Sequence, residues 1–227
     1  MSSPVPFEDN DPSRRAREVF HDWAETGRAD RMATSHGPSA RAAFDRLTLM
    51  PGQRYLDIGC GTGYTLAWAA EAVGDEGHVL GIDVAPGMVA AARSQLAALA
   101  PVRVLEGAWP DVGSGAGPFD AIFSMEVFYY LRDLPGALKA VHDALRPGGR
   151  FALVIDHYRE NVASHSWSTD LAVPMHLLAV AEWEQAFRAA DLVVRESTRL
   201  RAPVVADEPV SWKHEQGSLF LLGVRGE

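Results

Sequence analysis

Three glycines at alternate positions follow a short apolar run near residue 58. The segment reads Asp57-Ile58-Gly59-Cys60-Gly61-Thr62-Gly63-Tyr64, and a helical pattern follows it. Glycines at such a turn lack Cβ atoms, so a ligand can lie against the backbone, and the helix N-terminus directs N–H groups at it. The segment therefore predicts a ligand site at the end of a strand.

Two carboxylates accompany this turn. Asp57 precedes it, and Asp83 follows Gly63 by 20 residues, at the end of the next expected strand. A carboxylate at that second place can accept hydrogen bonds from a ribose diol. Asp57 is poorly placed for a pyrophosphate and well placed for a cationic amine, so the pair favours a ligand with an ammonium group and a ribose.

The glycine spacing also bears on the class of ligand. Dinucleotide-binding proteins use G-x-G-x-x-G to bring a pyrophosphate against the helix. Here the spacing is G-x-G-x-G, and Tyr64 stands where the third glycine would be. A nicotinamide-dependent oxidoreductase is therefore the less favoured enzyme class.

Composition and charge argue against further classes of binding partner and against a disulfide. The 227 residues include 21 Lys and Arg against 30 Asp and Glu, a formal net charge of −9. So acidic a chain binds polyphosphates poorly, and neither nucleic acid nor a membrane is expected as a partner. The single cysteine, Cys60, allows no internal disulfide. With no secretory signal read at the N-terminus, a cytoplasmic location is expected.

The elements that must position these residues alternate along the chain. Strands are expected at Arg54–Ile58, His78–Asp83, Val102–Glu106, Phe119–Met125, Phe151–His157, Leu192–Leu200 and Leu219–Arg225. Helices are expected at Ser13–Gly27, Pro38–Leu47, Thr62–Val73, Pro86–Leu99, Leu134–Leu145 and Ala181–Ala190. This order predicts an α/β fold with a parallel sheet covered on both faces and a terminal antiparallel hairpin.

The domain organisation expected is simple. Residues 1–12 are interpreted as a flexible tail and residues 13–227 as one domain. Within that domain, residues 13–48 form an N-terminal helical cap. Residues 159–180 are a long irregular stretch, interpreted as an insertion or lid that binds substrate.

Four segments in order resemble the class I S-adenosylmethionine-dependent methyltransferases, closest to the small-molecule enzymes that include the quinone-methylating ones. They are Asp57–Gly63, Val79–Met88, Phe119–Glu126 and Leu145–Phe151. The resemblance implies a Rossmann-like, doubly wound, seven-stranded sheet of order 3-2-1-4-5-7-6 with strand 7 antiparallel. It implies S-adenosyl-L-methionine as the cofactor.

The resemblance also implies roles for single residues. The methionine end of the cofactor would lie at Asp57 and the glycine turn, the ribose at Asp83, and the adenine between Val84 and Met88. Where the family commonly has Gly-Asp-Ala after the third strand, this chain has Gly107-Ala108-Trp109, so the acid that binds adenine is missing. The cofactor-binding residues expected are Asp57, Gly59, Gly61, Gly63, Asp83, Val84, Met88, Ala108 and Trp109.

Methyl transfer from a sulfonium needs alignment and desolvation, and some acceptors also need a base. The candidate catalytic residues are Glu126, after the fourth strand, and His157, after the fifth. For each a structural role is the alternative: a cap for Glu126 and a buried hydrogen-bonding group for His157. Other side chains considered for the acceptor side are Asp156, Tyr158, His165, Trp167, His176, His21, Trp23 and His36.

The sequence thus favours an S-adenosylmethionine-dependent enzyme that methylates a small-molecule acceptor. The alternative is a non-catalytic member that binds the cofactor or a partner. No metal is expected, because Asp156, His157, His165 and His176 are not spaced as ligands. The acceptor, the atom methylated and the oligomeric state are left open, and a homodimer is compatible with the sequence.

Overall fold

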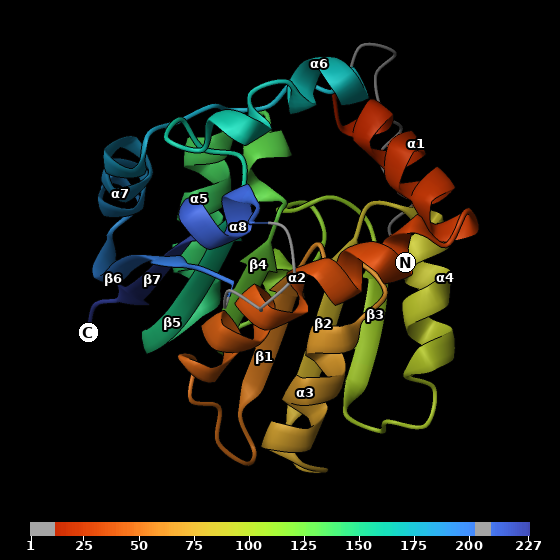
Figure 1. Cartoon of the computed structure of the whole chain (residues 1–227). Helices are drawn as coiled ribbons and strands as arrows, with labels where there is room; N and C mark the ends of the chain where they lie inside the picture. Colours follow the sequence, from red (N-terminus) through yellow and green to blue (C-terminus); the bar gives the residue numbers. More distant parts are fainter. Residues whose placement is uncertain (1–11, 203–209) are drawn as a thin grey trace.

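A seven-stranded sheet forms the centre of the molecule (Figure 1). The structure, a computed structural model, describes residues 12–202 and 210–227. The sheet order is β3-β2-β1-β4-β5-β7-β6, with β7 antiparallel to both of its neighbours, which confirms the expected topology. The strands are β1 (Arg54–Ile58), β2 (His78–Asp83), β3 (Val102–Glu106), β4 (Phe119–Met125), β5 (Leu145–Ile155), β6 (Leu192–Leu200) and β7 (Ser218–Arg225).

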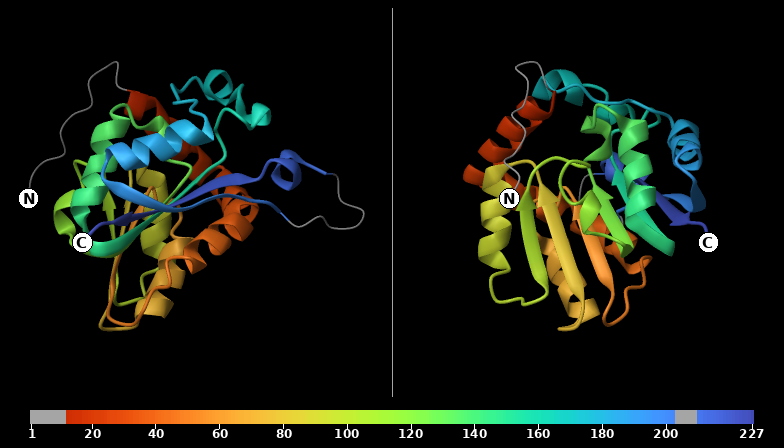
Figure 2. Two further views of the ribbon diagram at one scale, coloured as in Figure 1. Left: turned by 90° about the vertical axis from the view of Figure 1, so that its left-hand side faces the viewer. Right: turned by 180° about the vertical axis from the view of Figure 1, so that it is seen from behind.

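Helices cover both faces of the sheet (Figure 2). Side chains alternate along each strand, so Tyr55 and Leu56 of β1 enter different hydrophobic clusters. The Tyr55 side is packed by α2 (Arg28–Asp45), α3 (Tyr64–Val73) and α4 (Pro86–Gln95). The opposite side is packed by α5 (Leu134–Ala144) and α7 (Val180–Ala189). Burial on both faces explains why the central strands are almost continuously apolar.

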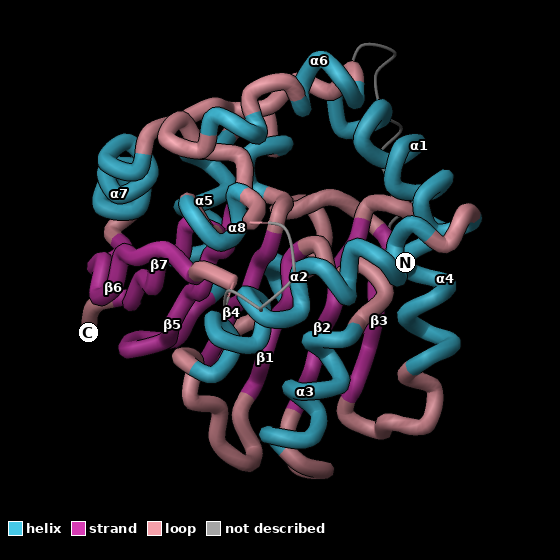
Figure 3. The backbone as a smooth tube through the Cα atoms, viewed as in Figure 1, coloured by secondary structure: helices cyan, strands magenta, loops and turns pink. Residues whose placement is uncertain are grey.

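Helix α1 (Pro12–Glu25) lies beyond one end of the strands, whereas α2 runs across the face of the sheet (Figure 3). Helix α1 packs against α4 and α2. Residues 1–11 of the expected tail lie outside the described residues. The expected insertion, 159–180, contains η3 (Val162–Ser164) and α6 (Trp167–Leu171), and its Val173 packs against α1. Among the helices of the described ranges, none is long and apolar enough to cross a membrane.

The largest differences from the expected boundaries are at three elements, and the other ends agree to within two residues. Helix α2 begins at Arg28 rather than Pro38, and Pro38 lies inside the helix instead of in its first turn. Helix α4 ends at Gln95, where Leu99 was expected. Strand β5 begins at Leu145, and the Pro-Gly-Gly run lies within it, where the pairing with β4 jumps from Leu145 to Arg150. That run therefore forms an irregularity within the strand.

Candidate cofactor and acceptor site

A cavity of about 1150 Å³, its open mouth included, lies at the carboxyl ends of β1, β2 and β4. Strand β1 pairs with β2 on one side and with β4 on the other, so the strand order reverses there. Open α/β sheets bind their ligands at such a reversal. Helices α1 and α2 supply the opposite wall, through Phe20, Met32 and His36 among others.

The three glycines of the turn have different surroundings. Gly59 has φ 78°, and a Cβ there would lie 2.1 Å from a methyl carbon of Val127. Gly61 has φ 52°, and a Cβ there would meet no atom within 4 Å, because the residue borders the open cavity. Gly63 does not line the cavity; a Cβ on it would lie 2.7 Å from Leu96. Gly63 therefore permits the close packing of α3 against α4, whereas Gly61 opens the site.

Asp57, at the end of β1, carries a buried oxygen that is free to accept a hydrogen bond. Its carboxylate is 2% exposed, and Oδ2 accepts a hydrogen bond from the Thr65 hydroxyl. Oδ1 has no partner within the described part of the chain. Burial raises the pKa of Asp57 to about 7, against the opposing effect of the Thr65 hydrogen bond. A ligand ammonium would supply the missing donor and a compensating charge.

Asp83, at the end of β2, ties the glycine turn to the neighbouring strand. Its Oδ2 accepts from the Gly61 backbone N–H at 2.9 Å, and its Oδ1 accepts from the Ala85 N–H at 2.9 Å. Burial raises the pKa of this carboxyl to about 6, although these backbone hydrogen bonds lower it. Each oxygen keeps a further lone pair. Asp83 can therefore hold the turn in shape and still accept ribose hydroxyls.

The remaining cofactor-side residues form a mostly apolar wall. Val84, Met88, Ala108 and Trp109 all line the cavity. The Trp109 indole is 5% exposed, and its Nε1 donates to the Ala137 carbonyl at 2.9 Å, which fixes the ring. The free oxygen of Asp57 and the open space at Gly61 fit S-adenosylmethionine, whose ammonium and ribose need such acceptors.

Glu126, directly after β4, reaches the cavity in a constrained conformation. Its φ is 61°, which costs about 1–2 kcal/mol for a residue with a Cβ. Its Oε2 accepts from the Tyr129 hydroxyl at 2.8 Å, and its Oε1 accepts from the Asp156 backbone N–H at 2.5 Å. Burial and the nearby Asp156 charge raise its pKa well above the usual range. The side chain is thus fixed at the acceptor end of the cavity.

His157 lies in the core, away from the cavity lining. The ring is 1% exposed, and its Nδ1 lies 3.0 Å from the Ser164 carbonyl oxygen. It packs against Tyr129 and stacks on Trp167 with ring centres 6.2 Å apart. The two candidate catalytic residues are therefore separated, with Glu126 at the cavity and His157 holding the 159–180 segment against the sheet.

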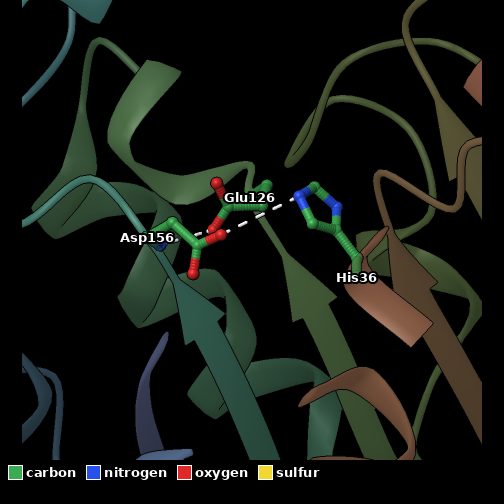
Figure 4. A group of neighbouring side chains, drawn as sticks. All are labelled: His36, Glu126 and Asp156. Atoms are coloured by element: carbon green, nitrogen blue, oxygen red, sulfur yellow. Dashed lines mark hydrogen bonds and ion pairs between the residues drawn. The ribbon is translucent and has the colours of Figure 1, made fainter. Parts of the chain in front are cut away.

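A group of side chains that sequence spacing did not reveal lies beside Glu126. His36 comes from α2 and lines the cavity, and Asp156 follows β5. His36 Nε2 lies 3.8 Å from Asp156 Oδ2 (Figure 4). His36 and Asp156 are 120 residues apart in the chain, so only the tertiary fold brings them together.

Comparison with known proteins agrees with this geometry. A family profile described as "Methyltransferase domain" matches residues 56–149. Aklanonic acid methyltransferase DauC of Streptomyces sp. strain C5 is 37% identical over 126 residues, 54% of this chain and 56% of that protein. Nocamycin O-methyltransferase of Saccharothrix syringae is 39% identical over 118 residues, 51% of this chain and 42% of that protein. The chain thus matches about half the length of these curated relatives.

A solved structure matches over nearly the whole chain. It is a chain in the complex between the Haloferax volcanii Trm112 methyltransferase activator and a methyltransferase, with a TM-score of 0.82 and 28% identity. The match covers 92% of this chain and 98% of that one. The matched profile begins in β1 and contains the glycine turn, Asp83 and Glu126. Residues 56–149 thus match the methyltransferase-domain family, and nearly the whole chain shares the fold of this solved methyltransferase chain.

Proposed function

We propose that this protein transfers the methyl group of S-adenosylmethionine to a small-molecule acceptor. The observation that carries the proposal is the unpartnered buried oxygen of Asp57 beside the open space at Gly61. Two of the relatives are named as a methyltransferase of aklanonic acid and an O-methyltransferase of nocamycin, which supports a small acceptor. The net charge of −9 argues against a nucleic acid as acceptor.

The chain's own residues bind and orient the cofactor. Asp57 accepts hydrogen bonds from the ammonium, and Asp83 accepts them from the ribose hydroxyls. Met88, Val84 and the fixed ring of Trp109 hold the adenine by apolar contact, with the backbone at Ala108 in place of the missing acid. S-adenosylmethionine supplies an electrophilic methyl group on a positively charged sulfur.

The acceptor end of the cavity aligns the second reactant and excludes water. Its lining includes the apolar side chains Phe20, Met32, Tyr130 and Leu131. Alignment in a water-poor site accounts for much of the rate of such a displacement. Glu126 is the only one of the two predicted bases that lines this cavity, and we assign it the contact with the acceptor. We assign His157 to packing.

The proposal is tested by calorimetric titration of the protein with S-adenosylmethionine, S-adenosylhomocysteine and NAD. We expect micromolar binding of the two sulfur nucleosides and none of NAD, because Tyr64 replaces the glycine that a pyrophosphate needs. Binding of NAD alone would instead favour a nicotinamide-dependent oxidoreductase. Binding of none of the three would favour the non-catalytic alternative.

A further inference from the structure

Three donor side chains from separate elements point at one small space beside the cavity. His36 of α2, Glu126 after β4 and Asp156 after β5 each bring one ligand-type atom within 4.8 Å of the others (Figure 4). Two of them, His36 and Glu126, line the cavity. The cofactor contacts assigned above use none of the three.

Asp156 is the least expected member of this group. Its side chain is 1% exposed, and neither carboxylate oxygen has a hydrogen-bond partner within the described ranges. The Ser218 hydroxyl donates to Ser39 Oγ at 3.2 Å. A buried carboxylate without donors is costly unless a charge or a metal compensates it.

His36 does not provide that compensation through a hydrogen bond. The 3.8 Å between Nε2 and Asp156 Oδ2 is too long for a hydrogen bond. Two donors bound to one ion at about 2.1 Å lie no more than about 4.2 Å apart. The pair is therefore spaced like two ligands of one ion.

Glu126 completes the set without giving up its other bonds. Its oxygens accept from Tyr129 and from the Asp156 backbone, and each keeps a lone pair. Lys213 of α8 (Trp212–Glu215) is a positively charged group that acts electrostatically on both carboxyls. Its ammonium donates to the Ser35 carbonyl at 2.8 Å. This ammonium is thus bonded to α2 through Ser35.

We propose that His36, Glu126 and Asp156 bind one divalent first-row transition ion at the acceptor end of the cavity. One imidazole nitrogen with two carboxylate oxygens suits Mn²⁺, Fe²⁺ or Zn²⁺ better than Mg²⁺ or Ca²⁺. Three protein ligands leave a position open toward the cavity, where an acceptor oxygen can coordinate. That use of the ion rests on the proposed function, whereas the site itself rests on the geometry. The sequence led us to expect no metal, after weighing Asp156 with three histidines other than His36; the proposed site joins Asp156 to His36 and Glu126 instead.

The test uses the full chain without a histidine tag, stripped with EDTA and titrated with Mn²⁺ alone. Loss of the electron paramagnetic resonance signal of free Mn²⁺ measures binding. We expect one ion per chain, and binding more than about a hundredfold weaker in Asp156→Asn and in His36→Gln, since even outer-shell partners contribute 10–100-fold. Lys213→Met should bind more tightly, because it removes a repelling charge.

The matched control is Glu25→Gln, which alters an exposed histidine–carboxylate pair with His21 Nε2 3.6 Å from Glu25 Oε1. It should bind as the wild type does. Thermal unfolding followed by circular dichroism identifies any misfolded variant, and His36→Gln, at a cavity-lining position of α2, serves if Asp156→Asn does not fold. No Mn²⁺ binding at millimolar concentration, or equal binding in both ligand variants, overturns the site. Titration with S-adenosylhomocysteine on the same samples tests the proposed function separately.

Discussion

Asp57 offers the sharpest test of the cofactor contacts, through replacement by asparagine. The amide keeps an acceptor for the Thr65 hydroxyl but loses the charge that faces the cavity. A hydrogen bond to a charged group contributes about 1.5–3 kcal/mol, so S-adenosylhomocysteine should bind about 10- to 150-fold more weakly. Isothermal titration calorimetry at pH 7.5 measures this. Asp75→Asn, in an exposed turn, is the matched control and should leave the affinity unchanged.

The same residue predicts a pH dependence of binding. In the free protein the pKa of Asp57 is about 7, and a bound ammonium favours the charged carboxylate. Binding below pH 7 must therefore expel a proton, and the dissociation constant should rise toward about tenfold per pH unit. Titrations at pH 6 in two buffers of different ionisation enthalpy should show this release in the wild type. The Asp57→Asn variant should release at most half as many protons on binding as the wild type does.

The free energy of unfolding should change with pH in the direction opposite to the cofactor affinity, because protonation of Asp57 favours folding and disfavours binding. The folded pKa of about 7 lies above the unfolded value near 3.8, so the folded state holds its proton more tightly. Stability from this group is complete below about pH 4 and is lost as pH rises through about 7, a change of up to about 4 kcal/mol. Unliganded Asp57→Asn should therefore be more stable than the wild type at pH 8 and similar to it at pH 4.

Urea unfolding at the two pH values measures that difference. A folded Asp57→Asn variant that binds S-adenosylhomocysteine as tightly as the wild type would refute the ammonium contact. A variant less stable than the wild type at pH 8 would refute the reasoning about burial.

Three further predictions concern the turn and the two candidate catalytic positions. Gly59→Ala should lower the free energy of unfolding in urea by about 2–5 kcal/mol, from its positive φ and the collision with Val127. Gly61→Ala should cost only about 1–2 kcal/mol of stability while weakening cofactor binding in calorimetry, because its Cβ enters the cavity. His157→Ala should lower the melting temperature and leave cofactor affinity unchanged, because its ring is buried against Trp167; unchanged stability would contradict the packing role.

Much of the architecture was predictable from local pattern. All seven strands were expected, because most of them carry a short apolar run that is buried in the sheet, as β1, β2, β4, β5 and β7 do. The glycine turn and the two acids beside it lie within a single β-α-β unit, so their spacing along the chain reflects their spacing in the fold. Eight of the nine expected cofactor residues line the cavity, and those of the turn do so for that reason.

The acceptor side was less predictable, for a physical reason. The first ten residues of α2 were missed because Pro38 favours a helix start, whereas here the helix continues through it. His36 lies in that missed segment, and its neighbours Glu126 and Asp156 come from two later strands. The spacing of residues along the chain does not indicate which distant residues come together in the folded protein. Likewise, the position of His157 after β5 did not reveal which way its ring points.

The most direct test of the central claim is a crystal structure of the protein with S-adenosylhomocysteine bound. The account predicts the ligand in the cavity at the ends of β1, β2 and β4, with its amino nitrogen within hydrogen-bonding distance of Asp57. It also predicts the ribose hydroxyls on Asp83 and the adenine between Met88 and Trp109. A ligand bound elsewhere, or one whose amino group lies away from Asp57, would contradict the account.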